Sequence, residues 1–142
     1  MEWMILPLKR YFDFRGRSRR REFWMFVVLE IVLITIAMFV DVALGYGQAD
    51  SYAHATDGYS AGFSVNSQGP VTIIAMLALF IPAIAVAARR LHDTERSAWW
   101  LLLFFVPLFG WIALLVFYCL EGTSGPNRFG EDPKGRAPTA YV

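Results

Sequence analysis

The sequence predicts an all-α integral membrane protein with an interfacial N-terminal helix and three transmembrane helices, the third of them kinked. Two observations indicate this fold class. Hydrophobic residues make up 56% of the 142 residues and charged residues only 18%, whereas soluble domains average about 45–50% and about 25%. In addition, the apolar residues are gathered in three long runs.

The three apolar runs are each long enough to cross a bilayer. They cover residues 23–44, 71–88 and 98–120, which are 22, 18 and 23 residues, and a membrane helix needs about 20 residues or slightly fewer. In the third run, Pro107 and Gly110 lie near the middle and predict a kink. Because 22 residues precede the first run, we expect a retained anchor and not a cleaved signal peptide.

The positive charges predict the orientation of the first two spans. Residues 1–22 carry seven Lys and Arg, the inner turn 89–97 carries three, and the loop 45–70 carries none. Because Lys and Arg flanking a span stay in the cytoplasm, we expect the N-terminus and the inner turn inside. The loop 45–70, rich in glycine and serine, is then a flexible external loop.

The C-terminal tail can lie on either side of the membrane. Three continuous spans put it outside, with ten positive charges inside and three outside; a re-entrant third segment turning at Pro107–Gly110 gives thirteen inside and none outside. A re-entrant segment needs its irregular backbone buried in protein, and so short a chain offers little cover. We therefore expect a kinked span and an outside tail, within one membrane domain over 1–135 and a flexible end over 136–142.

The N-terminal segment alternates aromatic and basic residues. One helical face can hold Trp3, Met4, Leu8, Tyr11 and Phe12, which is typical of an interfacial helix. Beside a span, a basic cluster favours anionic lipid headgroups, and its position explains the charge without nucleic acid. The arginines expected to make that contact are Arg15, Arg17, Arg19, Arg20 and Arg21.

Glu30 is an acid seven residues inside the first apolar run. An ionised side chain there is costly and should face protein, and Arg89 and Arg90 at the inner end of the second run are its natural partners. A structural ion pair between the two spans is the interpretation we favour. The alternative is a protonatable site for coupled transport.

The inner turn contains His92 and Asp93, a pair found in metal-dependent phosphohydrolases. Such a site needs further His and Asp ligands, and the only other histidine, His54, lies in the predicted external loop. No Gly-x-Ser-x-Gly nucleophile elbow is present, and the single Cys119 excludes an intramolecular disulfide and a Cys-based zinc cluster. We therefore expect no enzyme, metal or cofactor; a lipid-directed enzyme using His92 and Asp93 is the weakest hypothesis.

Three sequence blocks together resemble a known family. They are Tyr-Phe-x-Phe-x-Gly-Arg-x-Arg-Arg-x-Glu-Phe-Trp from residue 11, Arg-Arg-Leu-His-Asp-Thr-x-Arg-Ser-x-Trp-Trp from residue 89, and Gly-Thr-x-Gly-Pro-Asn-Arg-Phe-Gly-x-Asp-Pro from residue 122. In this order they resemble the YhaH/YhaI-type small bacterial inner-membrane proteins, a domain-of-unknown-function family. The resemblance implies a plasma-membrane protein of a few helices and implies no activity, substrate or cofactor. Its candidate residues are His92, Asp93, Arg96, Trp99 and Trp100 in the inner turn, and Gly125, Asn127, Arg128, Gly130, Asp132 and Pro133 in the tail.

The sequence leaves two principal functions open. We expect a non-enzymatic plasma-membrane protein that acts through contacts with lipid, with other copies of itself as a homo-oligomer, or with a larger membrane complex. The alternative is a small oligomeric proton-coupled transporter or channel in which Glu30 titrates.

Overall fold

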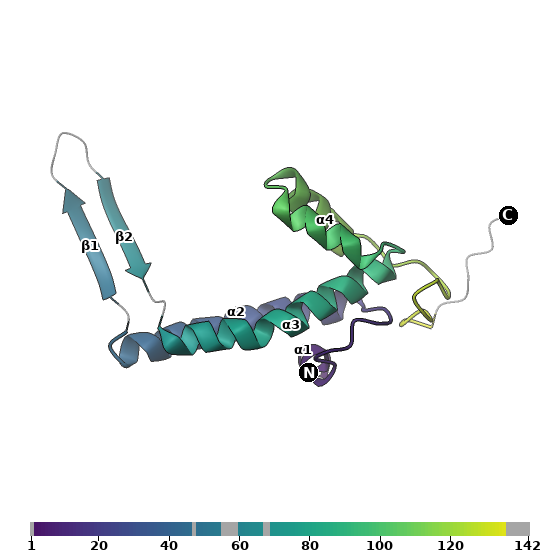
Figure 1. Ribbon diagram of the computed structural model, residues 1–142, viewed down its shortest axis with the longest axis horizontal. Coiled ribbons are helices and arrows are strands. Elements are labelled where there is room, and N and C mark those ends of the chain that lie inside the picture. Colours follow the sequence, from purple (N-terminus) through teal and green to yellow (C-terminus); the bar gives the residue numbers. More distant parts are fainter. Residues whose placement is uncertain (1, 47, 55–59, 67–68, 136–142) are drawn as a thin grey trace. The chain divides into compact units, whose positions relative to one another are not determined.

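The computed structural model describes residues 2–46, 48–54, 60–66 and 69–135. The chain divides into two compact units, Met1–Leu29 with Phe80–Val142, and Glu30–Leu79. Along the chain (Figure 1), the elements are α1 (Glu2–Lys9), α2 (Arg20–Ala43), β1 (Gln48–His54), β2 (Ser60–Asn66), α3 (Pro70–Asp93), the 3-10 helix η1 (Ala98–Phe105) and α4 (Phe109–Cys119).

The two long helices α2 and α3 lie where the first two apolar runs predict them. Each has 24 residues and a mean hydropathy of 2.6 over its most apolar stretch. At 1.5 Å per residue such a helix is about 36 Å long, which exceeds the roughly 30 Å of a bilayer's hydrocarbon core. By length and composition both helices can cross a membrane, and the predicted helical character of both runs is confirmed.

The third apolar run differs from its prediction. Instead of one kinked helix over 98–120, the chain forms η1 and α4, which pack against each other as a hairpin (Figure 1). The rings of Trp100 and Phe117 are 5.4 Å apart, whereas 17 residues of continuous helix would separate them by about 25 Å. The chain reverses at Leu108, which has a positive φ of 63°. The prediction of a single kinked helix over this run is therefore wrong.

Two features explain why the chain folds back here. Pro107 has no N–H for a helix and restricts the residue before it, so the helical pattern ends at this point. Gly110 then allows close packing, because a Cβ there would lie 1.9 Å from the carbonyl oxygen of Leu103. Hydropathy carries neither signal, since both halves of the hairpin are apolar.

The N-terminal helix is shorter than the predicted interfacial helix. α1 ends at Lys9, so Tyr11 and Phe12, which we placed on its apolar face, follow in a turn and linker. Gly16, with a φ of 81°, lets the linker turn before α2 begins at Arg20.

Within the second unit, the side chain of Asp41 caps the start of α3. Its two carboxylate oxygens accept the backbone N–H groups of Val71 at 3.1 Å and Thr72 at 2.7 Å, which have no partner inside the helix. Gly69 makes room for the carboxylate, because a Cβ there would lie 2.1 Å from the Asp41 Cγ. Asp41 thus joins the end of α2 to the start of α3.

The loop 45–70 contains an antiparallel hairpin that the sequence did not predict. Gln48 pairs with Asn66 at one end of the ladder and His54 with Ser60 at the other. Strand pairing satisfies the backbone hydrogen bonds that a fully flexible loop would leave to water. The hairpin is the departure from the all-α expectation, and the predicted flexible end over 136–142 lies outside the described residues.

Candidate functional site

The side chain of Arg17 lies at the centre of a buried polar cluster in the first unit. Its Nε donates to Oδ1 of Asp93 at 3.0 Å, and Nη2 lies 2.9 Å from the same oxygen. Nη1 donates to the carbonyl oxygen of Gly125 at 2.7 Å, and Nη2 to that of Thr123 at 2.5 Å. Only 1% of the side chain is exposed. One guanidinium thus joins the linker before α2, the end of α3 and the segment after α4.

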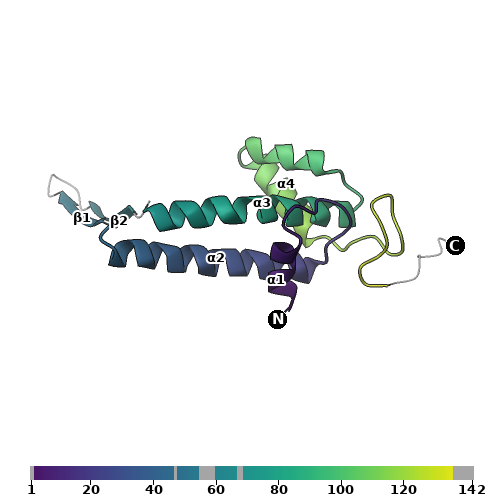
Figure 2. The same ribbon diagram turned by 60° about the horizontal axis from the view of Figure 1, so that its bottom comes forward.

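The backbone on both sides of Arg17 is held by the last turns of α3. The N–H of Ser18 donates to the carbonyl oxygen of Arg89 at 3.1 Å, and Nδ1 of His92 lies 3.2 Å from the carbonyl oxygen of Gly16. Figure 2 shows the purple linker after α1 crossing this end of α3. These two contacts fix the direction in which the Arg17 side chain enters the cluster.

Asp93, the last residue of α3, distributes its two oxygens between two arginines. Oδ1 accepts from Arg17, while Oδ2 accepts from Nη1 of Arg90 at 2.6 Å. Its backbone oxygen accepts the N–H of Thr123 at 2.9 Å. Gly122 allows this approach, because a Cβ there would lie 1.9 Å from Oδ2 of Asp93. A larger residue at this position would require the tail or the carboxylate to move.

Arg90 also binds the end of α4. Its Nε donates to the carbonyl oxygen of Tyr118 at 3.2 Å, and its Nη2 donates to that of Leu120. The last carbonyls of a helix have no intrahelical donor and carry partial negative charge, so a buried guanidinium stabilises them. This contact joins the end of the η1–α4 hairpin to the end of α3.

An aromatic stack attaches the tail motif to the inner turn. The rings of His92 and Phe129 are parallel, with centroids 4.0 Å apart and planes 6° apart. Nδ2 of Asn127 donates to the carbonyl oxygen of His92 at 2.9 Å, and the Arg128 guanidinium lies over the other aromatic partner, Phe129, at 4.6 Å. His92 is thereby used as a packing surface.

A second ion pair lies beside this network. Nη2 of Arg89 is 3.6 Å from Oε1 of Glu22, and their side chains are 0% and 5% exposed. Within the described part of the chain, none of the three guanidinium nitrogens of Arg89 has a hydrogen-bond partner. Removing each ion of such a pair from water costs on the order of several kcal/mol, and the attraction between the two ions offsets part of that cost.

The buried charges of the cluster balance. Three arginines face three acids, with Asp132 Oδ1 at 4.0 Å from Arg17 Nη2. Because opposite charges compensate one another inside the protein, the cluster needs no bound ion to be neutral. The members are Arg17, Arg89, Arg90, Glu22, Asp93 and Asp132.

Comparison with known proteins places this chain in a family. The family described as "Protein of unknown function (DUF805)" matches residues 11–131. The chain belongs to this family. It is 42% identical over 134 residues to the inner membrane protein YhaH of Escherichia coli strain K12, covering 94% of this chain and 98% of YhaH. It is equally similar to the inner membrane protein YhaI of the same strain, covering 94% of this chain and 97% of YhaI. No solved structure matches the chain.

The family assignment confirms the resemblance carried by the three sequence blocks. In this DUF805 member the blocks are also the three segments that meet at Arg17 and Asp93. Together with the two long apolar helices, the inner-membrane relatives support a location in a bacterial inner membrane.

The structure gives Arg89 and Arg90 partners other than the one predicted. Arg89 faces Glu22 and Arg90 binds Asp93, so neither arginine requires Glu30 to compensate its charge. The side-chain hydrogen bonds and ion pairs found within the described ranges do not include the Glu30 carboxylate. An ion pair of Glu30 with these arginines stays a prediction.

The five arginines predicted to contact anionic lipid have different surroundings. Arg17 is buried in the cluster, Arg19 donates to the carbonyl oxygen of Pro133, and Arg20 donates to that of Cys119 at 3.1 Å. Arg15 and Arg21 are exposed. Three of the five therefore have contacts within the protein, and contact of this group with anionic lipid stays a prediction.

The remaining predicted residues belong to the inner-turn and tail motifs. Arg96 lies over the ring of Phe117 at 4.1 Å, and Trp99 and Trp100 are exposed by 78% and 45%. In the tail, Gly130 pairs with Asn127 in a tight turn. Among the described residues no group of three or more His, Cys, Asp and Glu side chains lies close enough to hold a metal ion.

Sequence reasoning missed the cluster roles of Glu22, Gly122 and Thr123. Glu22 belongs to the first sequence block and precedes the apolar run by one residue, and this position was the available signal. Gly122 and Thr123 belong to the third sequence block, and their position there was the available signal. Only the fold shows that they approach Asp93.

Proposed function

We propose that this chain is a non-enzymatic protein of a bacterial inner membrane that acts through contacts with lipid, with further copies of itself or with a larger membrane complex. The observation that carries the proposal is the balanced cluster around Arg17 and Asp93. Its side chains bind one another and backbone carbonyl oxygens. These contacts hold separate segments of the chain together, which supports a structural role for the cluster.

The cluster also supports a topology with the tail in the cytoplasm. Arg17 in the N-terminal linker directly contacts Asp93 at the end of α3 and Gly125 in the tail, so all three segments belong on one side of the membrane. Lys and Arg mark that side as cytoplasmic. All thirteen positive charges are then inside. Of the two topologies left open by the sequence, we therefore favour the re-entrant third segment over the outside tail.

The η1–α4 hairpin suits partial insertion into the inner half of the bilayer. Eleven residues of α4 extend about 16 Å, roughly half of the hydrocarbon thickness, and the residues at the turn are strongly exposed, with Phe105 at 79% and Phe109 at 76%. Backbone at membrane depth must be satisfied internally. Nε1 of Trp111 donates to the carbonyl oxygen of Phe104 at 2.9 Å, and the N–H groups of Phe109 and Gly110 donate within the turn.

A reporter fused after Val142 tests the topology. Reporters that are active only in the periplasm or only in the cytoplasm are compared, with a fusion within residues 45–70 as the external control. Cytoplasmic activity after Val142 supports the proposal. Periplasmic activity there contradicts it, because the contacts of Arg17 could not then form.

One observation favours a second function, a small oligomeric proton-coupled transporter or channel. Arg89 and Arg90, the predicted partners of Glu30, pair with Glu22 and Asp93. Glu30 is then an acid within an apolar helix that these two arginines do not neutralise. Such residues are typical of ion pathways. Proton flux into vesicles that is lost on Glu30→Gln, with unchanged protein insertion, would support transport over a purely structural role.

A further inference from the structure

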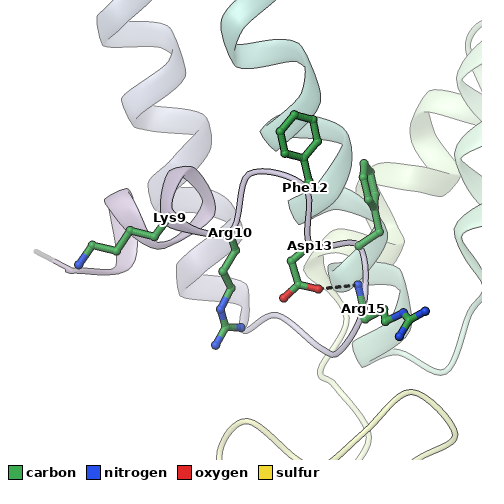
Figure 3. Close-up of a pocket in the computed structure, with 6 residues that line it drawn as sticks. Lys9, Arg10, Phe12, Asp13 and Arg15 are labelled. Atoms are coloured by element: carbon green, nitrogen blue, oxygen red, sulfur yellow. Dashed lines mark hydrogen bonds between the residues drawn. The ribbon is translucent and has the colours of Figure 1, made fainter.

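We propose that the linker between α1 and α2 binds the phosphate of an anionic phospholipid headgroup, through Lys9, Arg10 and Arg15. The proposal rests on the membrane location argued above and adds a ligand and a site to it. The three residues line an open hollow of about 540 Å³ together with Phe12, Asp13 and Phe14 (Figure 3).

The hollow has an excess of positive charge that the protein does not use. Within the described part of the chain, the side chains of Lys9, Arg10 and Arg15 make no hydrogen bond or ion pair, and all three are exposed. The one acid, Asp13, uses its Oδ1 to accept the backbone N–H of Arg15 at 3.1 Å. Three cations and one carboxylate line the hollow, and a phosphate group supplies the missing negative charge.

These cations differ from the neighbouring arginines of the same basic stretch. Arg17, Arg19 and Arg20 donate to carbonyl oxygens of the protein, and the buried cluster is neutral by itself. The charges of Lys9, Arg10 and Arg15 are therefore available to an anion, whereas the three neighbouring arginines already donate within the protein.

The aromatic residues of the hollow identify a lipid as the source of the phosphate. Phe12 is 76% exposed and Phe14 is 41% exposed. Figure 3 shows Phe12 and the guanidinium of Arg10 pointing away from the linker in opposite directions. An exposed apolar ring on one side and a cation on the other suit the boundary between acyl chains and headgroups, and a soluble phosphate would leave the rings in water.

The position of the linker along the chain also places it at the boundary between acyl chains and headgroups. The linker ends only a few residues before the apolar part of α2, which starts at Phe23. A segment this close to a span lies at the headgroup level, where Lys and Arg gain most from anionic lipid.

The test measures lipid retention by the full chain in detergent, using native mass spectrometry with added phosphatidylglycerol or phosphatidylcholine. The triple variant Lys9→Gln, Arg10→Gln, Arg15→Gln should retain phosphatidylglycerol at least about tenfold less strongly, given the attraction expected for each basic residue. The matched control removes three positive charges from the tail, through Arg128→Gln, Lys134→Gln and Arg136→Gln, and should stay within about twofold of wild type. Phosphatidylcholine should be retained weakly by all three proteins.

Further variants keep the test independent of folding. Asp13→Asn should increase phosphatidylglycerol retention, since it removes the only acid of the hollow, and Phe12→Ala should decrease it without a change of charge. Equal loss in the control triple, or no loss in the linker triple, overturns the site. Displacement of the lipid by an equal concentration of inorganic phosphate overturns the lipid as its occupant. Resistance of the chain to extraction from membranes by alkaline carbonate reports on the proposed membrane location separately.

Discussion

The guanidinium of Arg17 binds one carboxylate oxygen of Asp93, at 3.0 Å from Nε and 2.9 Å from Nη2, and leaves the other oxygen to Arg90. Both side chains are almost completely buried. Because Arg17 also holds the carbonyl oxygens of Thr123 and Gly125, this pair connects the N-terminal linker with the tail through the end of α3. The following predictions test that role and the fold around it.

Gly122→Ala should destabilise the protein although it adds only one methyl group. The new Cβ would lie 1.9 Å from Oδ2 of Asp93, so the tail or the carboxylate must move and the bond from Arg90 is weakened. We expect a loss of about 1–3 kcal/mol, as for overpacked sites, measured by unfolding in detergent. Ser124→Ala two residues later is the control and should change stability by less than about 0.5 kcal/mol.

A double-mutant cycle separates the two candidate partners of Arg90. Arg90→Gln and Asp93→Asn should each destabilise the protein and show a coupling free energy of about 0.5–3 kcal/mol, as expected for residues in one network. Arg90→Gln and Glu30→Gln should be additive within about 0.5 kcal/mol. Strong coupling between Arg90 and Glu30 would instead restore the ion pair predicted from the sequence.

Cross-linking tests the reversal of the third apolar run. In a Cys119→Ser background, Trp100→Cys and Phe117→Cys should form a disulfide or react with a short bifunctional maleimide, because the rings they replace are 5.4 Å apart. The control pair Trp100→Cys and Leu108→Cys places the second thiol at the turn and should react poorly. A single kinked span would place positions 100 and 117 about 25 Å apart and would give no intramolecular product.

The sequence predicts the long membrane helices of this fold and misses its two hairpins. Hydropathy located α2 and α3, because a bilayer requires long uninterrupted apolar runs. It could not separate one kinked helix from the η1–α4 hairpin, since both are apolar throughout, and the reversal depends on the backbone at Leu108 and the close packing at Gly110. The β1–β2 hairpin was missed because its glycine- and serine-rich sequence is equally typical of a loop.

The site was predictable in its segments and not in its pairs. All six members of the cluster lie within the three sequence blocks. Composition could not distinguish Arg17, which is buried, from Arg15 and Arg21, which are exposed. The same limit applies to Asp41, whose capping of Val71 and Thr72 depends on a contact 30 residues away in sequence.

The most direct test of the structural role of the cluster is a double-mutant cycle on Arg17 and Asp93, followed by unfolding of the full chain in detergent. Arg17→Ala and Asp93→Ala should each cost about 3–5 kcal/mol, since each leaves a buried charge without its partner. The double variant should cost clearly less than the sum, with Arg17→Lys intermediate because it cannot reach Asp93, Thr123 and Gly125 together. Small and additive losses, each below about 1 kcal/mol as for exposed ion pairs, would contradict the account.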